Sequence, residues 1–134
     1  MSHAPRHSRR VALAAALVLA LGACAGDSLS PFEPQINSAT DNFQLQATNV
    51  TNVSFTRTYA WVNTGTRASV NHSTVTSAGT TLVVIKDATG AVVYSSALSA
   101  SLNEATIAGQ PGNWSIQLTL TGYSGTLNFR VQKL

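Results

Sequence analysis

The sequence is poor in cysteine, histidine and charge. Its 134 residues include one cysteine, three histidines and five acidic residues, and charged residues make up only 10% of the chain. A single cysteine excludes an internal disulfide, so an oxidising compartment cannot add a covalent cross-link. No motif repeats at a fixed period, which excludes a solenoid. No glycine-rich phosphate loop is present either, because the glycines are scattered through predicted turns.

Residues 1–23 have the pattern of a cleavable export signal. Arg6, Arg9 and Arg10 form a basic segment, and an unbroken apolar run follows at residues 11–21. That run is too short to cross a bilayer, which takes about 20 residues, but it fits the apolar core of a signal peptide.

The apolar run ends in Leu21-Gly22-Ala23-Cys24, which resembles the bacterial lipobox. In that motif an apolar residue and two small residues precede a cysteine whose thiol takes a diacylglycerol. The resemblance implies cleavage before Cys24 and a lipid anchor there; the alternative is an ordinary signal with an incidental cysteine. The usual retention signal, an Asp directly after the cysteine, is replaced by Ala25. The resemblance therefore implies a lipid-anchored protein of the bacterial cell envelope, in the outer membrane.

Removal of this signal leaves a chain that is electrically neutral. The full chain has a formal charge of +3, and the three arginines of the predicted signal account for it. Five basic and five acidic residues remain: Arg57, Arg67, Lys86, Arg130 and Lys133 against Asp27, Glu33, Asp41, Asp87 and Glu104. A neutral chain without a basic cluster has no electrostatic footprint for nucleic acid. We expect contact with a membrane only through the lipid.

Residues 25–41 have the composition of a linker, with Pro31, Pro34, several serines and no hydrophobic period. As a flexible coil this segment would span about 20–25 Å. The sequence therefore predicts three parts: a signal peptide (1–23), a lipidated cysteine with a flexible tether (24–41) and a folded domain (42–134). Phe32 and Ile36 either dock on that domain or are incidental.

From residue 42 onward, short apolar runs alternate with turn signals. In residues 80–96 two β-branched runs flank the turn sequence Asp87-Ala88-Thr89-Gly90. Both faces of the first run, residues 82–85, are apolar, which predicts a strand covered on two sides. Further turns are predicted at residues 63–66, 77–79 and 122–125, and residues 97–107 fit either a strand or a helical turn. About eight short strands predict an all-β fold, a single antiparallel β-sandwich of the jelly-roll type.

Four features of the second half follow one another in a fixed order. They are the apolar strand at residues 82–85, the D-x-x-G turn at 87–90, a G-x-aromatic strand that begins at 112–114 and a short Gly-rich hairpin at 124–131. In this order they resemble the bacterial pre-peptidase C-terminal domain. The resemblance implies a jelly-roll sandwich and a non-catalytic accessory module of secreted proteins. Such modules usually follow an enzyme, whereas this one follows a lipid anchor.

Candidates for catalysis or metal binding are few. His72 is the only histidine outside the predicted signal, and a general base needs a nucleophile and a carboxylate beside it. One histidine also cannot complete a tetrahedral zinc site. We therefore predict a structural histidine, no enzymatic activity, no cofactor and no metal. The alternative is calcium, for which Asp87, Asn103 and Glu104 offer oxygen ligands if their loops meet.

Two classes of function fit these features. The first is a non-catalytic envelope lipoprotein that acts as a structural or protein-interaction module. Such a module can take a partner strand at a sheet edge, and residues 126–133 are the predicted edge because Arg130 and Lys133 are charges of the kind that guard one.

The second class is a glycan-binding module, which needs exposed aromatic rings on which sugars stack. Tyr123, in a predicted turn, is the first candidate, since Trp61 and Trp114 are in phase with apolar neighbours and are expected in the core. The predicted contacts with an envelope protein or a polysaccharide are Tyr123, Asn128 and Arg130.

Overall fold

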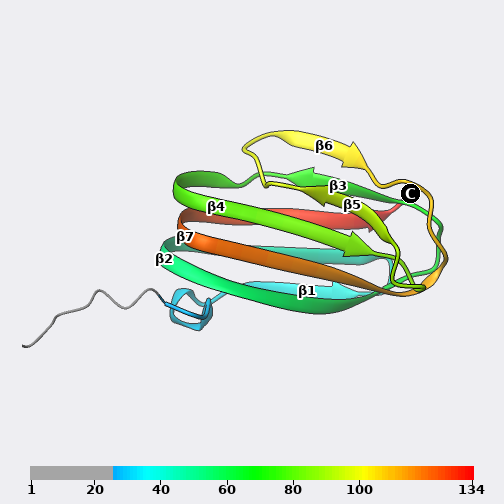
Figure 1. Cartoon of the computed structure of the whole chain (residues 1–134), viewed down its shortest axis with the longest axis horizontal. Coiled ribbons are helices and arrows are strands. Elements are labelled where there is room, and N and C mark those ends of the chain that lie inside the picture. Colours follow the sequence, from blue (N-terminus) through cyan, green and yellow to red (C-terminus); the bar gives the residue numbers. More distant parts are fainter. Residues whose placement is uncertain (1–25) are drawn as a thin grey trace, which may run out of the picture.

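The computed structural model describes residues 26–134, which form seven strands and one short 3-10 turn (Figure 1). In chain order they are η1 (Ser30–Phe32), β1 (Gln35–Ala39), β2 (Asn42–Asn63), β3 (Ala68–His72), β4 (Val75–Lys86), β5 (Val92–Ser96), β6 (Leu102–Ala105) and β7 (Gly112–Lys133). These strands pair antiparallel throughout, so the all-β prediction is confirmed, with seven strands where about eight were expected. The predicted signal peptide and Cys24 lie outside the described residues. Within the described range, no helix is long and apolar enough to cross a membrane.

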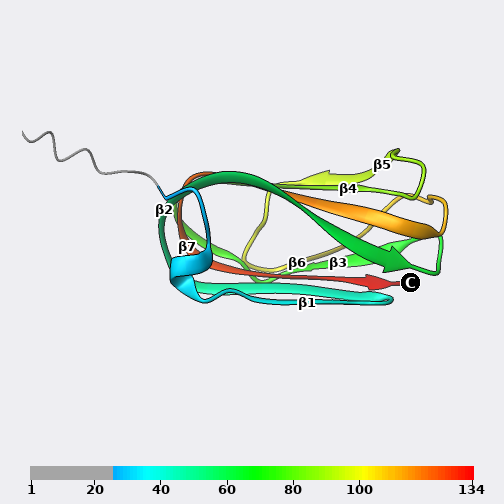
Figure 2. The same ribbon diagram turned by 90° about the horizontal axis from the view of Figure 1, so that it is seen from below.

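The strands form one continuous sheet that is folded over into two layers (Figure 2). The first half of β2 and the second half of β7 lie in one layer, in the order β1-β2-β7-β3-β6. Their other halves lie in the second layer, in the order β2-β7-β4-β5. The two layers are therefore not separate sheets. They are two halves of one sheet, and its two longest strands, β2 and β7, run through both.

Three long strands bend where the sheet folds over, and we call this region the corner. The bends contain residues with positive φ: Asn49 and Asn52 in β2, Gly79 in β4, and Gly122 and Gly125 in β7. Shifts in the pairing register lie beside them. Such bulges bend a strand and increase its twist, and Gly and Asn tolerate the left-handed conformation that they require. The segments 77–79 and 122–125, which the sequence predicts as turns between strands, are thus bends inside strands.

The inner faces of the two layers enclose the core. Its fully buried side chains include Phe43, Leu45, Val70, Val83, Ile85, Ile116, Leu118, Leu127 and Val131. Trp61 and Trp114 are both 1% exposed and meet edge to face, with ring centroids 5.8 Å apart. Their indole N–H groups donate to the carbonyls of Ala39 and Gln110, at 3.1 and 2.7 Å. The prediction that both tryptophans belong to the core is confirmed.

The predicted hairpin forms, with one correction. β4 and β5 pair around the turn at residues 87–90. Leu82, however, is 41% exposed and Val84 is half-buried, so the prediction that both faces of residues 82–85 are covered is wrong. The reason is that nothing in the described chain packs over the outer face of this layer. Residues 97–107, for which the sequence fits either a strand or a helical turn, contain the strand β6.

Residues 26–41 belong to the folded domain, so the predicted flexible tether is wrong for them. β1 pairs with the first residues of β2 over its whole length. Gly26 donates its N–H to the Asn52 carbonyl at 2.9 Å and accepts from the Ser54 N–H at 2.8 Å. Leu29 is 4% exposed and Phe32 packs against the core. The two prolines suggested a linker, but these apolar side chains and the pairing with β2 hold the segment in place.

Candidate binding surfaces

Tyr123 lies in the core and cannot serve as a platform for a sugar. It is fully buried within β7, and its hydroxyl donates to the Val75 carbonyl at 3.1 Å. The prediction of an exposed ring is wrong because residues 122–125 continue the strand through the corner. With Trp61 and Trp114 buried as well, none of the three aromatic residues considered for stacking reaches the surface.

The second half of β7 is an internal strand, so the predicted edge at residues 126–133 is also wrong. It pairs with β2 on one side and with β3 on the other. Its cations have other roles: Lys133 Nζ lies 3.0 Å from Asp41 Oδ2, and Arg130 Nη2 donates to Gln44 Oε1 at 3.1 Å. The charges suggested an edge, but the long β2–β7 hairpin places this strand between two neighbours.

The second half of β2 is an open edge of the sheet. In its layer this half pairs only with β7. Ser38 Oγ donates to the Ala60 carbonyl at 2.8 Å, which shows that this carbonyl points away from β7. In an antiparallel strand alternate residues direct their N–H and C=O to the same side. Thr56 and Thr58 therefore direct theirs outward, and among residues 26–134 no other segment forms a ladder with them.

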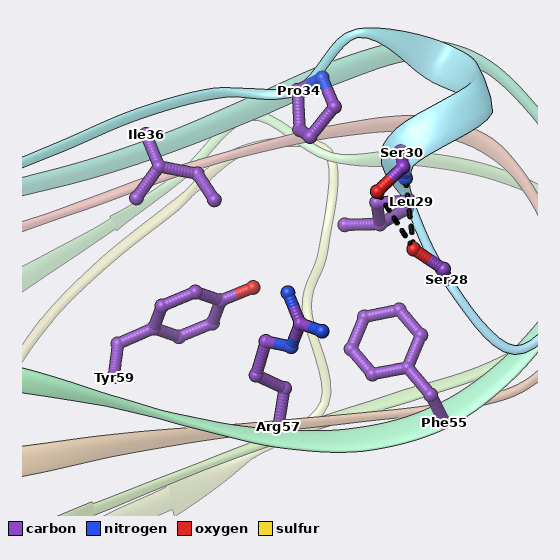
Figure 3. A pocket seen from close by; sticks show the side chains of 8 residues that line it. All are labelled: Ser28, Leu29, Ser30, Pro34, Ile36, Phe55, Arg57 and Tyr59. Carbon is purple, nitrogen blue, oxygen red and sulfur yellow. Dashed lines mark hydrogen bonds between the residues drawn. The ribbon is translucent and has the colours of Figure 1, made fainter.

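A narrow groove lies beside this edge, between β2 and the segment from Ser28 to Ile36 (Figure 3). Its lining residues are Ser28, Leu29, Ser30, Pro34, Ile36, Phe55, Arg57 and Tyr59. Its volume of about 20 Å³ holds about one water molecule. A ligand of any size must therefore lie along the groove and insert no more than the ends of its side chains. We call this surface the edge groove.

Arg57 supplies the charge of the edge groove. Its side chain rises from β2 between those of Phe55 and Tyr59 (Figure 3). No lining residue is acidic, and the ion pair found in the described part of the chain joins two other residues, Lys133 and Asp41. Burial raises the pKa of Tyr59, against the opposing effect of Arg57. The groove thus combines two half-buried aromatic rings with a guanidinium that lies beside the Tyr59 hydroxyl and forms no ion pair within residues 26–134.

The outer face of the five-stranded layer carries amide side chains in register. The cross-strand neighbours Asn37, Gln44, Arg130, Asn71 and Asn103 form one row from β1 to β6. Gln44, Arg130 and Asn71 face outward because the residues on either side of them along their strands are buried. Their register places Asn37 and Asn103 on the same face. A second row contains Gln35, Gln46 and Asn128. We call this surface the amide face.

A hollow of about 250 Å³ opens in the amide face. Its lining is entirely polar: Gln44, Asn71, Ser73, Asn128, Arg130 and Gln132. Asn128 and Arg130, which the sequence singles out, therefore lie in one site, and Tyr123 lies elsewhere. The other four residues were not predicted as contacts. The alternation of polar and apolar residues along the strands predicts which side chains face outward. It does not predict which outward side chains on different strands lie next to one another.

His72 is buried at one end of a chain of hydrogen bonds. The Ser99 N–H donates to His72 Nδ1 at 3.2 Å, and His72 Nε2 lies 2.8 Å from the Tyr94 hydroxyl, which donates to Glu104 Oε2 at 2.7 Å. Since Nδ1 accepts, the neutral imidazole carries its proton on Nε2 and donates to Tyr94. Burial lowers the pKa of His72, and burial together with the bond to Glu104 raises the pKa of Tyr94 to about 12. Because His72 is 2% exposed, a substrate cannot reach the ring from solvent.

Asp87 is bonded within its own turn, whereas Glu104 accepts from the Tyr94 hydroxyl, so the structure gives no support to the calcium alternative. Asp87 accepts hydrogen bonds from the backbone N–H groups of Thr89, Ala91 and Gln110 at 2.8–3.0 Å. These bonds and that from the Thr89 hydroxyl lower the pKa of Asp87 to about 2. Within residues 26–134, no three His, Cys, Asp or Glu side chains gather into a metal site.

No family model, curated protein or solved structure matches this chain. The resemblance to the pre-peptidase C-terminal domain therefore stays a prediction, and a function has to be argued from the two surfaces themselves.

Proposed function

We propose that this chain is a non-catalytic, lipid-anchored protein of the bacterial cell envelope that binds an extended segment of a partner protein at the edge groove. The observation that carries the proposal is the backbone of β2 at Thr56 and Thr58, which pairs with no other segment of residues 26–134, beside the guanidinium of Arg57, which has no acidic partner there. An edge of this kind can take a further strand through main-chain hydrogen bonds, while pockets beside it select side chains.

The geometry of an added strand defines the sequence that it should have. A residue directly opposite Arg57 faces the groove, and an acidic side chain there would form a charge-assisted pair with the guanidinium. Residues two positions before and after it face the same side, where they meet Phe55 and Tyr59. The partner segment should therefore read apolar-x-acidic-x-apolar.

The anchor is the lipobox cysteine. Acylation of Cys24 would place the lipid two residues before Gly26, and two residues span at most about 7 Å. Gly26 is bonded to β2 at the corner, so the corner would lie next to the lipid surface. Bacterial lipoproteins usually carry three acyl chains, more than the two membrane signals that stable attachment requires. An outer-membrane location follows from Ala25 in the lipobox pattern.

A random peptide library displayed on phage tests the partner site. We expect selected peptides to share the apolar-x-acidic-x-apolar pattern, and Arg57→Glu to shift the selection toward a basic central residue. Lys86→Glu is the matched control, because Lys86 is exposed at the end of β4, in the same layer, and does not line the groove. A selection that Arg57→Glu leaves unchanged would overturn the proposal, as would a selected peptide that still binds after its backbone N–H groups are methylated.

Cell fractionation tests the anchor. The wild-type protein should partition with the outer membrane, and Cys24→Ser should accumulate as an unprocessed precursor. Recovery of the wild-type protein in the soluble fraction, with an unmodified thiol, would contradict the lipid anchor and leave the partner site to be judged by the peptide selection.

A further inference from the structure

The amide face is a second surface, separate from the edge groove, and it has the chemistry of a sugar site. We infer that it binds a polysaccharide that contains hexuronic acid, with a sugar carboxylate at Arg130. This inference goes beyond the proposed function, since it concerns another ligand and other residues. It also needs no exposed aromatic ring.

The hydrogen-bonding groups of the hollow match those of a sugar. Each side-chain amide presents a carbonyl acceptor and two N–H donors, and a sugar hydroxyl both donates and accepts. Asn71 and Gln132 are exposed and Asn128 is half-buried, so all three amides are accessible from solvent. The hollow is bounded on three adjacent strands and has a volume of about 250 Å³, which admits a ring rather than a single ion.

The row of side chains across the sheet suits a chain of sugars rather than one sugar. Asn37, Gln44, Arg130, Asn71 and Asn103 occupy five adjacent strands in register. Adjacent strands are about 4.8 Å apart, so the row extends about 19 Å. A glycan that crosses the strands meets a polar side chain at every step, with the hollow near its middle.

Arg130 defines the acidic character of the ligand. Among residues 26–134 it is the only charged residue that lines the hollow, and it donates a hydrogen bond to the neutral amide oxygen of Gln44. A guanidinium can bind a carboxylate through two parallel hydrogen bonds, which a hydroxyl cannot match. Because no lining residue is acidic, nothing in the hollow opposes a negatively charged sugar.

Calorimetric titration of the full chain in detergent tests this inference with an oligogalacturonate and its methyl ester. The ester is the neutral counterpart of the acid with the same sugar backbone. We expect the acid to bind about tenfold more tightly, the effect of one charge-assisted contact. Arg130→Gln should abolish this difference. Asn128→Asp, which hardly changes the size of the side chain, should weaken binding of the acid and leave that of the ester unchanged.

Two controls separate this site from the rest of the molecule. Lys86→Gln, on the opposite layer, should leave both affinities unchanged. Arg57→Glu, which should weaken the binding of peptides with an acidic central residue at the edge groove, should leave sugar binding intact, so either proposal can fail alone. Absence of saturable binding, equal affinities for acid and ester, or equal competition by inorganic phosphate would each overturn the assignment of a hexuronate site.

Discussion

The Nε2 atom of His72 lies 2.8 Å from the hydroxyl oxygen of Tyr94, and this hydrogen bond joins the two layers of the sheet. His72 ends β3 in the five-stranded layer, and Tyr94 lies in β5, at the edge of the other layer. Tyr94 continues the chain to Glu104 of β6. The side of the molecule opposite the edge groove is thus closed by a polar contact between buried rings.

Stability should fall as His72 becomes protonated. Burial holds the pKa of His72 below its ordinary value of 6.5, with Glu104 opposing the shift. The unfolded chain therefore binds a proton more readily than the folded one, so the free energy of unfolding decreases as the pH falls below about 6.5. A protonated ring also cannot accept the Ser99 N–H. Urea denaturation at about pH 7.5 and 5 checks this, and His72→Gln should remove most of the difference.

Asp87 should govern stability in a more acidic range. Its pKa is about 2 in the folded chain against an ordinary value of 3.8, so its contribution is complete above about pH 4 and is lost as the pH falls toward 2. Asp87→Asn keeps the shape of the side chain but weakens three backbone hydrogen bonds, two within the 87–91 turn and one that ties the turn to Gln110. We expect a lower melting temperature at neutral pH and a smaller loss on acidification. An unchanged acid profile would contradict this role.

Trp114→Ala should destabilise the domain by about 3–5 kcal/mol, because it leaves a large cavity beside Trp61. It also leaves the Gln110 carbonyl without its indole donor. Val62→Ala is the control, since Val62 is 40% exposed and should change stability by no more than about 0.5 kcal/mol. Chemical denaturation measures both. A small effect at Trp114 would mean that the core on this side can close around the cavity.

Gly125→Ala should prevent folding, whereas Gly90→Ala should be tolerated. A β-carbon on Gly125, where φ is 144°, would collide with the Val75 carbonyl across the corner. Gly90 also has a positive φ, of 85°, but nothing lies within reach of an added β-carbon. The second change should cost about 1–2 kcal/mol, the penalty of a left-handed residue with a side chain. Circular dichroism and thermal unfolding distinguish the two outcomes.

The features of the fold that are local in sequence could be predicted from it. The turn at Asp87–Gly90 is specified by an aspartate that bonds its own backbone and a glycine with positive φ, both within the turn. The corner could not be recognised in the same way. Gly122 and Gly125 give the signal of a turn, and only the pairing with distant residues of β2 and β4 shows that the strand continues through them.

The candidate surfaces depend even more on distant pairing. Alternation with apolar residues marks Asn128 and Arg130 as outward-facing, but Gln44 joins them across 86 residues of sequence. The edge groove needs the segment around Leu29 and Ile36, whose composition suggests a linker. The alternating pattern around Arg57 does not show that this part of β2 lies at an edge of the sheet. A strand is an edge when no other strand pairs with one of its sides, and its own sequence does not contain that information.

The pairing of β1 with β2 also has a mechanical consequence. The described chain begins at one end of the long axis and its C-terminus lies toward the other, and the strands run along this axis (Figure 1). A tensile force between these ends acts parallel to the strands, whereas antiparallel hydrogen bonds lie perpendicular to them. The hydrogen bonds between the five residue pairs of β1 and β2 are then loaded in shear. They must break together and cannot break one after another. Under a force between these two ends, the domain would resist the load at β1 until all five pairs separate together.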